Sequence, residues 1–463
     1  MRRALVRGLV VLAGYTAALV WLTWPLGAHL TTHLPLPKFP CVLDVPYITW
    51  ALAWQSHALA TDPAHYVDAN IYYPDRGALF YGDPGLSALP LFAPVFLATG
   101  NPTLAINVVF LGGLALSATA LHLVVASWTG TPLAGVVAAA TLLANPQLTW
   151  GFLPWAPSYA VLALFPVLMR MAARPRRHWR DVLVQGVLIA LQALANLVYV
   201  AIAVVGPLAV LALARVARRP TRADGLRLAA SIALALLLMA PVYAGFAIVL
   251  RANPGVGGQS QWASAHVEVP DALRMFAVTV GGVVRPIISV PSGLFERSFV
   301  LWVATPTIFL VLAGGALAMI ARGRRGPPAS AWAHGALWAV IGLVLATPVA
   351  ALPGRPVVAL PHYVALAWLA PTLQEAIRDP DRIALASLMG WALLAGAAFA
   401  SVVSWLPARG RRMGAAVLAV VVTLALFRDY PPEAMAAYPL WVPVRGDSEV
   451  LAAVRARPGP VLD

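Results

Sequence analysis

The sequence predicts an all-α polytopic membrane protein with about 11 transmembrane helices, and composition is the first of three reasons. Of the 463 residues, 60% are hydrophobic and only 11% are charged, and the mean hydropathy is +0.79. Soluble globular proteins carry about 45–50% apolar and about 25% charged residues. The remaining polar side chains are too few to cover a surface that faces water, so lipid must surround most of it. This excludes a soluble enzyme and a disordered chain, and the single cysteine, Cys41, excludes a disulfide scaffold.

The second reason is the set of long apolar runs, because a helix needs about 20 such residues to cross the hydrocarbon core. The apolar stretch Leu86–Gly100 is interrupted by Pro90 and Pro94, and it is predicted to be a re-entrant or interfacial segment rather than a span. The other runs, with ends placed to within roughly 2–4 residues, begin near Leu5, Leu104, Leu133, Ser158, Val182, Tyr199, Leu228, Phe299, Trp332, Ile383 and Met413.

The third reason is the distribution of charge between the connecting segments. If the N-terminus lies in the cytoplasm, the inside segments hold 19 basic residues and two acids, and the outside segments hold 13 basic residues and 16 acids. The split of +17 inside against −3 outside follows the positive-inside rule. It accounts for the formal net charge of +14 without a nucleic-acid partner. We therefore expect the C-terminus to lie outside.

This topology divides the chain into a transmembrane module, residues 1–428, and an extracytoplasmic tail, residues 429–463, which resembles the start of a truncated domain. The long outer segments within the module are 27–103, 251–298 and 352–382. Connecting segments carry binding and catalytic residues more often than packed spans do. Chemistry is therefore expected on the outer face.

The first outer segment, 27–103, is the most informative. A helix is predicted over 45–60, and it places Tyr47, Trp50, Trp54 and His57 on one side at spacings of three or four residues. Tryptophans at the headgroup level are typical of a helix that lies along the membrane surface. Stacking on a sugar ring is the alternative role for the two tryptophans, and His57 is either a polar tip at the headgroups or a substrate contact.

Carboxylates in this segment are the candidate catalytic and binding groups. Asp44, at the start of the predicted helix, is the candidate general base, since partial desolvation at the mouth of the bundle would raise its pKa. Asp83, and after it Asp68, are candidates to bind sugar hydroxyls or a divalent cation, and Tyr72 is a further substrate contact. The alternative for each acid is a solvated or salt-bridged surface group.

Arginines of the later outer segments are the candidate phosphate ligands, because the planar guanidinium binds phosphate with two parallel hydrogen bonds. Contact with lipid phosphate is the alternative. The candidates are Arg285, Arg297, Arg378 and Arg382.

These residues also carry a resemblance. The run Asp44, Trp50-Ala51-Leu52-Ala53-Trp54, Asp62-Pro63, Asn70-Ile71-Tyr72-Tyr73-Pro74 and Asp83 resembles the first outer loop of bacterial GT-C type membrane glycosyltransferases, the group of lipid-A aminoarabinose transferase and protein mannosyltransferases. Asn101 and Asn107, the run from Leu191 to Tyr199, and Asp381-Arg382 look like later landmarks of the same group.

The resemblance implies an inverting transferase of the bacterial cytoplasmic membrane, with Asp44 as the essential acid. It implies a polyprenyl-phosphate-linked sugar as donor, an envelope glycan, lipid or protein as acceptor, and membrane lipids as partners. The resemblance leaves open whether a divalent cation serves as a cofactor. Two other functions stay open: a transporter or flippase for a lipid or amphipathic solute, which needs polar groups along a path at membrane depth, and an inactive relative that scaffolds envelope assembly.

Overall fold

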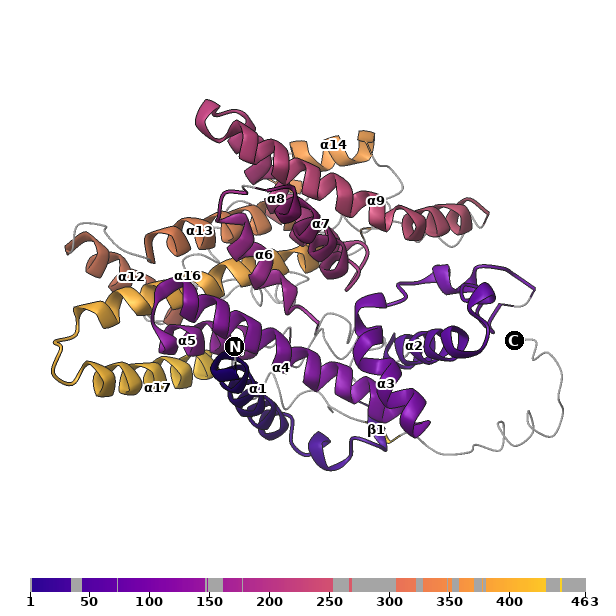
Figure 1. Ribbon diagram of the computed structural model, residues 1–463, viewed down its shortest axis with the longest axis horizontal. Helices are drawn as coiled ribbons and strands as arrows, with labels where there is room; N and C mark the ends of the chain where they lie inside the picture. Colours follow the sequence, from indigo (N-terminus) through magenta and orange to yellow (C-terminus); the bar gives the residue numbers. More distant parts are fainter. Residues whose placement is uncertain are drawn as a thin grey trace.

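A computed structural model shows a bundle of helices whose long axes run past one another in several directions (Figure 1). The prediction of a helical membrane protein with several spans is confirmed. The residues that the structure describes are 2–34, 44–72, 74–145, 148, 161–176, 178–252, 266–268, 305–321, 328–347, 349–351, 358–369, 377, 380–429 and 442–443.

Each segment predicted to span contains a helix. Six described helices, α1, α4, α8, α9, α13 and α16, are long and apolar enough to cross a membrane, and α5 and α12 are shorter apolar helices. The helices of these segments are α1 (Arg2–Leu22), α4 (Pro102–Thr129), α5 (Pro132–Leu143), α6 (Leu164–Ala172), α7 (Trp179–Ala193), α8 (Tyr199–Val216), α9 (Arg222–Ala252), α12 (Pro306–Ala321), α13 (Pro328–Ala346), α16 (Leu385–Trp405) and α17 (Arg411–Asp429).

The remaining α-helices among the described residues belong to segments predicted to lie outside. They are α2 (Asp44–Thr61), α3 (Leu89–Thr99) and α14 (Pro361–Leu369). With 11 residues α3 is about 16 Å long, which is too short to cross a hydrocarbon core of about 30 Å. This length agrees with the prediction of a re-entrant or interfacial segment.

Local sequence sets the junction between α3 and α4. Gly100 takes a left-handed conformation (φ +66°) and ends α3, as glycine does at many helix C-termini. Asn101 then caps α4, because its side-chain oxygen accepts a hydrogen bond from the Leu104 amide at 2.9 Å. Pro102 occupies the first turn, where a missing amide hydrogen costs nothing.

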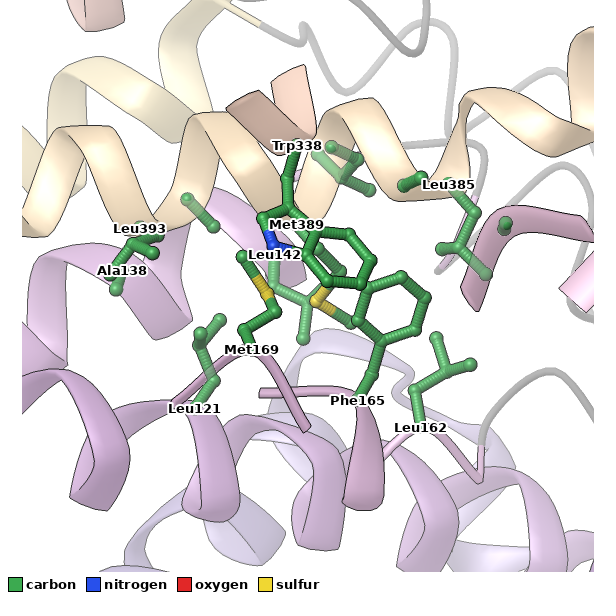
Figure 2. Close-up of a cluster of buried hydrophobic side chains, with 14 of the residues drawn as sticks. Leu121, Ala138, Leu142, Leu162, Phe165, Met169, Trp338, Leu385, Met389 and Leu393 are labelled. Carbon is green, nitrogen blue, oxygen red and sulfur yellow. The ribbon is translucent and has the colours of Figure 1, made fainter. Parts of the chain in front are cut away.

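The main core lies around α16, in which 17 of the 21 residues are buried. Figure 2 shows Trp338 of α13 against Phe165 of α6, with ring centroids 5.2 Å apart, and Met389 of α16 beside them. All three side chains are buried. Because lipid supplies no hydrophobic force between helices, close van der Waals contact has to hold this core together.

Glycines allow α13 and α16 to approach closely. A Cβ atom at Gly342 or at Gly390 would lie less than 3.0 Å from the backbone of the facing helix. Only a residue without a side chain fits at these two positions. The two helices therefore contact each other backbone to backbone.

At one end of the bundle, segments predicted to lie outside meet one another. We call it the outer end. The side-chain amide of Asn107, at the start of α4, donates to the carbonyls of Leu30 (2.7 Å) and His33 (2.8 Å). The Tyr243 hydroxyl in the second half of α9 donates to the Leu197 carbonyl, just before α8. These contacts agree with the predicted order of inside and outside segments.

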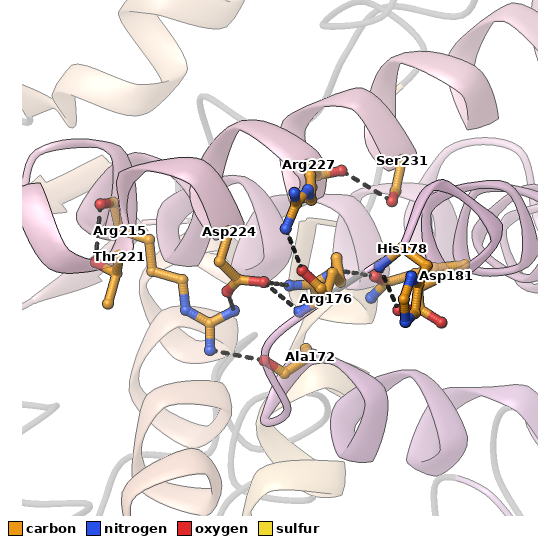
Figure 3. Close-up of polar contacts among 10 residues, drawn as sticks. Ala172, Arg176, His178, Asp181, Arg215, Thr221, Asp224, Arg227 and Ser231 are labelled. Atoms are coloured by element: carbon orange, nitrogen blue, oxygen red, sulfur yellow. Dashed lines mark hydrogen bonds and ion pairs between the residues drawn. The ribbon is translucent and has the colours of Figure 1, made fainter.

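At the opposite end, segments predicted to lie inside meet. Figure 3 shows Asp224, in the first turn of α9, between Arg176 and Arg215. One carboxylate oxygen accepts from the Arg176 amide (2.7 Å) and Nη1 (3.0 Å), and the other lies 2.8 Å from Arg215 Nη1. Arg227 Nη1 donates to the Arg176 carbonyl at 2.6 Å. We call Arg176, Arg215, Asp224 and Arg227 the Asp224 network.

Short strands are a departure from the expected all-helical chain. β1 (His33–Leu34) pairs antiparallel with β5 (Val442–Pro443). β2 (His266–Glu268) pairs parallel with β3 (Val349–Ala351), and β3 pairs antiparallel with β4 (Val358–Ala359). Strands of two or three residues carry too little apolar alternation for the sequence to have indicated them.

Candidate functional site

The helix α2 spans Asp44–Thr61, so the helix predicted over 45–60 is confirmed. Asp44 provides its first residue, at the N-terminal end of a helix, where a carboxylate is favoured by the helix dipole. The side chain of Asp44 lies outside the described part of the structure. Its role as general base therefore stays a prediction.

Asp83 is half-buried at the outer end and joins two distant parts of the chain. Its Oδ1 accepts from the Gly85 amide at 3.0 Å. Its Oδ2 accepts from the side-chain amide of Asn196 and from the Leu197 amide, the latter at 3.2 Å. Burial raises the pKa of Asp83 to about 6, and the hydrogen bonds from Gly85 and Leu197 oppose that shift. Both oxygens already have protein donors, which favours a positioning role over direct contact with a sugar.

Asn196 connects this carboxylate to the start of α8. Its Oδ1 accepts from the amides of Val198 (3.1 Å) and Tyr199 (2.7 Å), while its Nδ2 donates to Asp83. One side chain therefore satisfies amides at the helix start, which have no partner within the helix, and also fixes the first outer segment. The Asn196 side chain thus joins the start of α8 to a loop carboxylate 113 residues away in the sequence.

Arg382 reaches the same place from a third segment. It lies in the 3-10 helix Pro380–Ala384, before α16, and its guanidinium stands over the ring of Tyr199 at 5.1 Å. Tyr199 is the residue whose amide binds Asn196. Of the arginines proposed from the sequence, Arg382 is thus brought to the Asp83–Asn196 junction.

Tyr47 of α2 lies next to Gly82 and near Asp83. Burial is the larger cause of its raised pKa, and the charge of Asp83 adds to it. The Tyr47 hydroxyl is buried and has no hydrogen-bond partner among the described residues. Its ring fits only because residue 82 is glycine, since a Cβ there would lie 2.8 Å from Tyr47 Cζ. Tyr47 is one turn along the helix from Asp44, so the start of α2 lies close to the Gly82–Asp83 segment.

The two tryptophans of α2 face the rest of the first outer segment. Trp50 Nε1 donates to Asn70 Oδ1 at 3.0 Å, and Trp54 Nε1 donates to the Tyr66 carbonyl at 2.9 Å. Both are partly buried, whereas His57, 6.3 Å from Trp54 between ring centroids, is exposed. In this arrangement the indoles hold residues 66–70 over α2. Stacking of these two indoles on a sugar stays a prediction.

Asp68 and Tyr72 lie farther along the same segment. Asp68 Oδ1 accepts from the Gly77 amide at 2.8 Å and closes the turn between them. Tyr72 lies within that turn with φ +58°, is 59% exposed, and contacts the ring of Tyr81 at 4.9 Å. A tyrosine in the left-handed region is unusual and marks a turn that its surroundings fix. Asp68 therefore shapes the turn that presents Tyr72.

Other sequence candidates fall outside the described residues. Arg297, Arg285 and Arg378 are among them. Within the described part of the chain, no group of three or more His, Cys, Asp or Glu side chains is placed to hold a metal ion. Sequence reasoning missed the buried hydroxyl of Tyr47 and the role of Gly82. The glycine directly before Asp83 was the available signal, because it permits a close approach that other residues block.

Fold and site together define a helical multi-span membrane protein with a polar junction at its outer end. No protein-family model matches the chain, and no curated protein is similar to it in sequence. Among solved structures, the chain is similar to ArnT from Cupriavidus metallidurans in the apo state. Identity is 13% and the TM-score is 0.37, over 86% of this chain and 78% of that chain. A similarity at this level leaves the function to be argued from the chain's own residues.

Proposed function

We propose that this protein is a membrane glycosyltransferase that moves a sugar from a polyprenyl-phosphate donor to an envelope acceptor on the outer face. One observation carries the proposal. The start of α2, the Asp83–Asn196 junction and Arg382 come from three separate segments and converge at the outer end. The first of these segments is the one that resembles GT-C type transferases in sequence.

Asp44 is the proposed general base. It accepts the proton of an acceptor hydroxyl or amine while that oxygen or nitrogen forms a bond to the anomeric carbon of the sugar. The bond between the anomeric carbon and the phosphate oxygen breaks in the same step, and the electron pair leaves with the lipid phosphate. A direct displacement of this kind inverts the anomeric centre. General base catalysis contributes typically 10²–10⁴-fold to such a rate.

Arg382 is the proposed ligand of the leaving phosphate. A guanidinium can stabilise the negative charge that grows on the phosphate oxygens as the bond breaks. The ring of Tyr199 fixes the position of Arg382, and Tyr199 is itself tied to Asn196 and Asp83. Asp83 then acts as a positioning residue, which holds the first outer segment in a fixed position relative to Arg382.

Transfer of label from a radiolabelled polyprenyl-phosphate sugar tests this proposal. In Asp44→Asn we expect transfer to fall by roughly 10²–10⁴-fold while the folded protein is retained. Asp62→Asn is the matched control, because Asp62 is an exposed acid in the same segment, paired with His65 at 2.8 Å. Equal transfer by the wild type and Asp44→Asn, or an equal loss in Asp62→Asn, would refute the role of Asp44.

The same assay separates the transferase from the other two functions. A flippase moves the intact donor, so the label stays on the polyprenyl phosphate, and Asp44→Asn has no effect on the product. An inactive scaffold transfers no label in the wild type. A flippase would also need polar groups along a path at membrane depth. Two candidates for such groups, Gln192 and Gln185, make contacts within the protein instead: Gln192 Nε2 donates to the Val161 carbonyl at 3.0 Å, and Gln185 accepts from Arg176.

A further inference from the structure

The end of the bundle that holds the Asp224 network also carries exposed arginines without acidic partners. Within the described residues, no ion pair joins any of these arginines to an acid. They come from the segment before α7, from α7 itself, from the connection between α8 and α9, and from the first residue of α9. They are Arg174, Arg180, Arg218, Arg219 and Arg222. We call them the arginine surface.

The two acids of this region are used inside the protein. Asp224 is paired with Arg176 and Arg215, and its side chain is 14% exposed. Asp181 accepts from the His178 amide at 3.1 Å and closes the capping box at the start of α7. The positive charge of the arginine surface is therefore not neutralised from within this region.

Exposed apolar side chains lie at the same level. Trp179 is 67% exposed and Leu183 is 58% exposed, both on α7, and Leu226 on α9 is 54% exposed. Tryptophan beside arginine at the end of a membrane helix is typical of the boundary between headgroups and acyl chains. Phosphates of lipid headgroups are thus expected within reach of these guanidinium groups.

The Asp224 network holds the segments of the arginine surface in fixed positions. Arg176 lies between Arg174 and α7, and it is buried and bound to Asp224 in α9. Arg215 Nη2 also donates to the Ala172 carbonyl at 2.8 Å, which ties the end of α8 to α6 (Figure 3). A surface that is already ordered loses less entropy when it binds a ligand.

We propose that the arginine surface binds the headgroups of anionic phospholipids in the adjacent leaflet, which the charge distribution predicts to be the cytoplasmic one. The diester phosphate of each headgroup accepts hydrogen bonds from one or two guanidinium groups, and the acyl chains lie along Trp179 and Leu183. This site lies at the N-terminal end of α7, whereas Asn196 follows the C-terminal end. The proposal of a lipid site does not depend on the proposed transferase activity.

Binding of fluorescent phosphatidylglycerol to the purified full-length protein in neutral detergent tests the proposal. Each arginine near a membrane surface contributes roughly a fivefold gain in affinity for anionic lipid. The triple variant Arg218→Gln, Arg219→Gln, Arg222→Gln should therefore bind roughly 100-fold more weakly. The matched control is Arg409→Gln, Arg411→Gln, Arg412→Gln, which removes the same charge from three exposed arginines at the start of α17. Because the Asp224 network does not hold this segment in a fixed position, the control should weaken binding by a clearly smaller factor than the first triple variant does.

Three outcomes would overturn the proposal. An equal loss in the two triple variants means that net charge alone attracts the lipid. Equal affinity of the wild type for phosphatidylcholine and phosphatidylglycerol removes the need for an anionic headgroup. Displacement of phosphatidylglycerol by an equimolar concentration of inorganic phosphate identifies a soluble anion as the ligand. Thermal unfolding checks that both variants keep their fold.

Discussion

Attachment of the first outer segment to the start of α8 should weaken as the pH rises from about 4 to about 6. Burial raises the pKa of Asp83 from 3.8 to about 6. If Asp83 becomes exposed to water when the junction opens, its pKa returns to the lower value. The difference of about 2 units corresponds to about 3 kcal/mol, at 1.36 kcal/mol per unit. The closed junction binds the proton more tightly than the open one. The closed junction is therefore most stable below about pH 4. Its stability falls between about pH 4 and about pH 6 and does not change further at higher pH.

Hydrogen exchange at two amides reports this opening directly. Gly85 and Leu197 both donate to Asp83 and lie far apart in the sequence. After correction for the intrinsic effect of pH on exchange, protection of both amides should fall by up to about 100-fold between pH 4 and pH 6. The two amides should lose protection together, because one carboxylate holds both.

Asp83→Asn is the decisive variant. A neutral amide does not titrate, so the pH dependence should disappear. In the variant, one of the two side-chain oxygens is replaced by an NH2 group, which is a donor. This group would face either the donors of Asn196 and Leu197 or the amide of Gly85, at a cost of about 1–3 kcal/mol. Asp68→Asn, which alters another acid of the same segment, should keep the pH dependence. Protection in the wild type that is constant from pH 4 to pH 6, or the same slope in Asp83→Asn, would refute this reasoning.

Two further substitutions test packing. Gly82→Ala should destabilise the junction by about 1–3 kcal/mol, because its Cβ collides with the ring of Tyr47. Gly14→Ala, where a Cβ meets nothing within 4 Å, is the control, and an equal fall in thermal stability in both variants would contradict the mechanism. Asp224→Asn should lower stability by about 3–5 kcal/mol, because it leaves buried Arg176 without its counter-charge. A melting temperature within 1–2 °C of the wild type would show that the pair contributes little; an effect of the expected size would shift it several times further.

Sequence patterns predicted the local features well because those features depend on neighbouring residues. Apolar length located the helices, and the spacing of Tyr47 and Trp54 indicated α2. The positive-inside rule predicted that the basic segments around Arg176 and Arg215 belong to the same side, and the Asp224 network joins them. In each case the signal lies within a window of about 20 residues or in a count of charges.

The candidate site was predicted only in part because its contacts join distant segments. Asp83 was chosen as a sugar or cation ligand, but nothing in the pattern around it indicates that Asn196 and Leu197 would supply its hydrogen-bond donors. The indole of Trp50 was expected at the headgroups or on a sugar, and it binds Asn70. Such pairings follow from the three-dimensional path of the chain, which hydropathy does not encode.

The glycine contacts between α13 and α16 also have a practical consequence. At Gly342 and Gly390 the two backbones meet with no side chain between them, so these two contacts leave little room for the helices to slide past each other. It is therefore a suitable fixed reference for spin labels or fluorescent probes. Distances measured from α16 to the first outer segment would record movement of that segment alone.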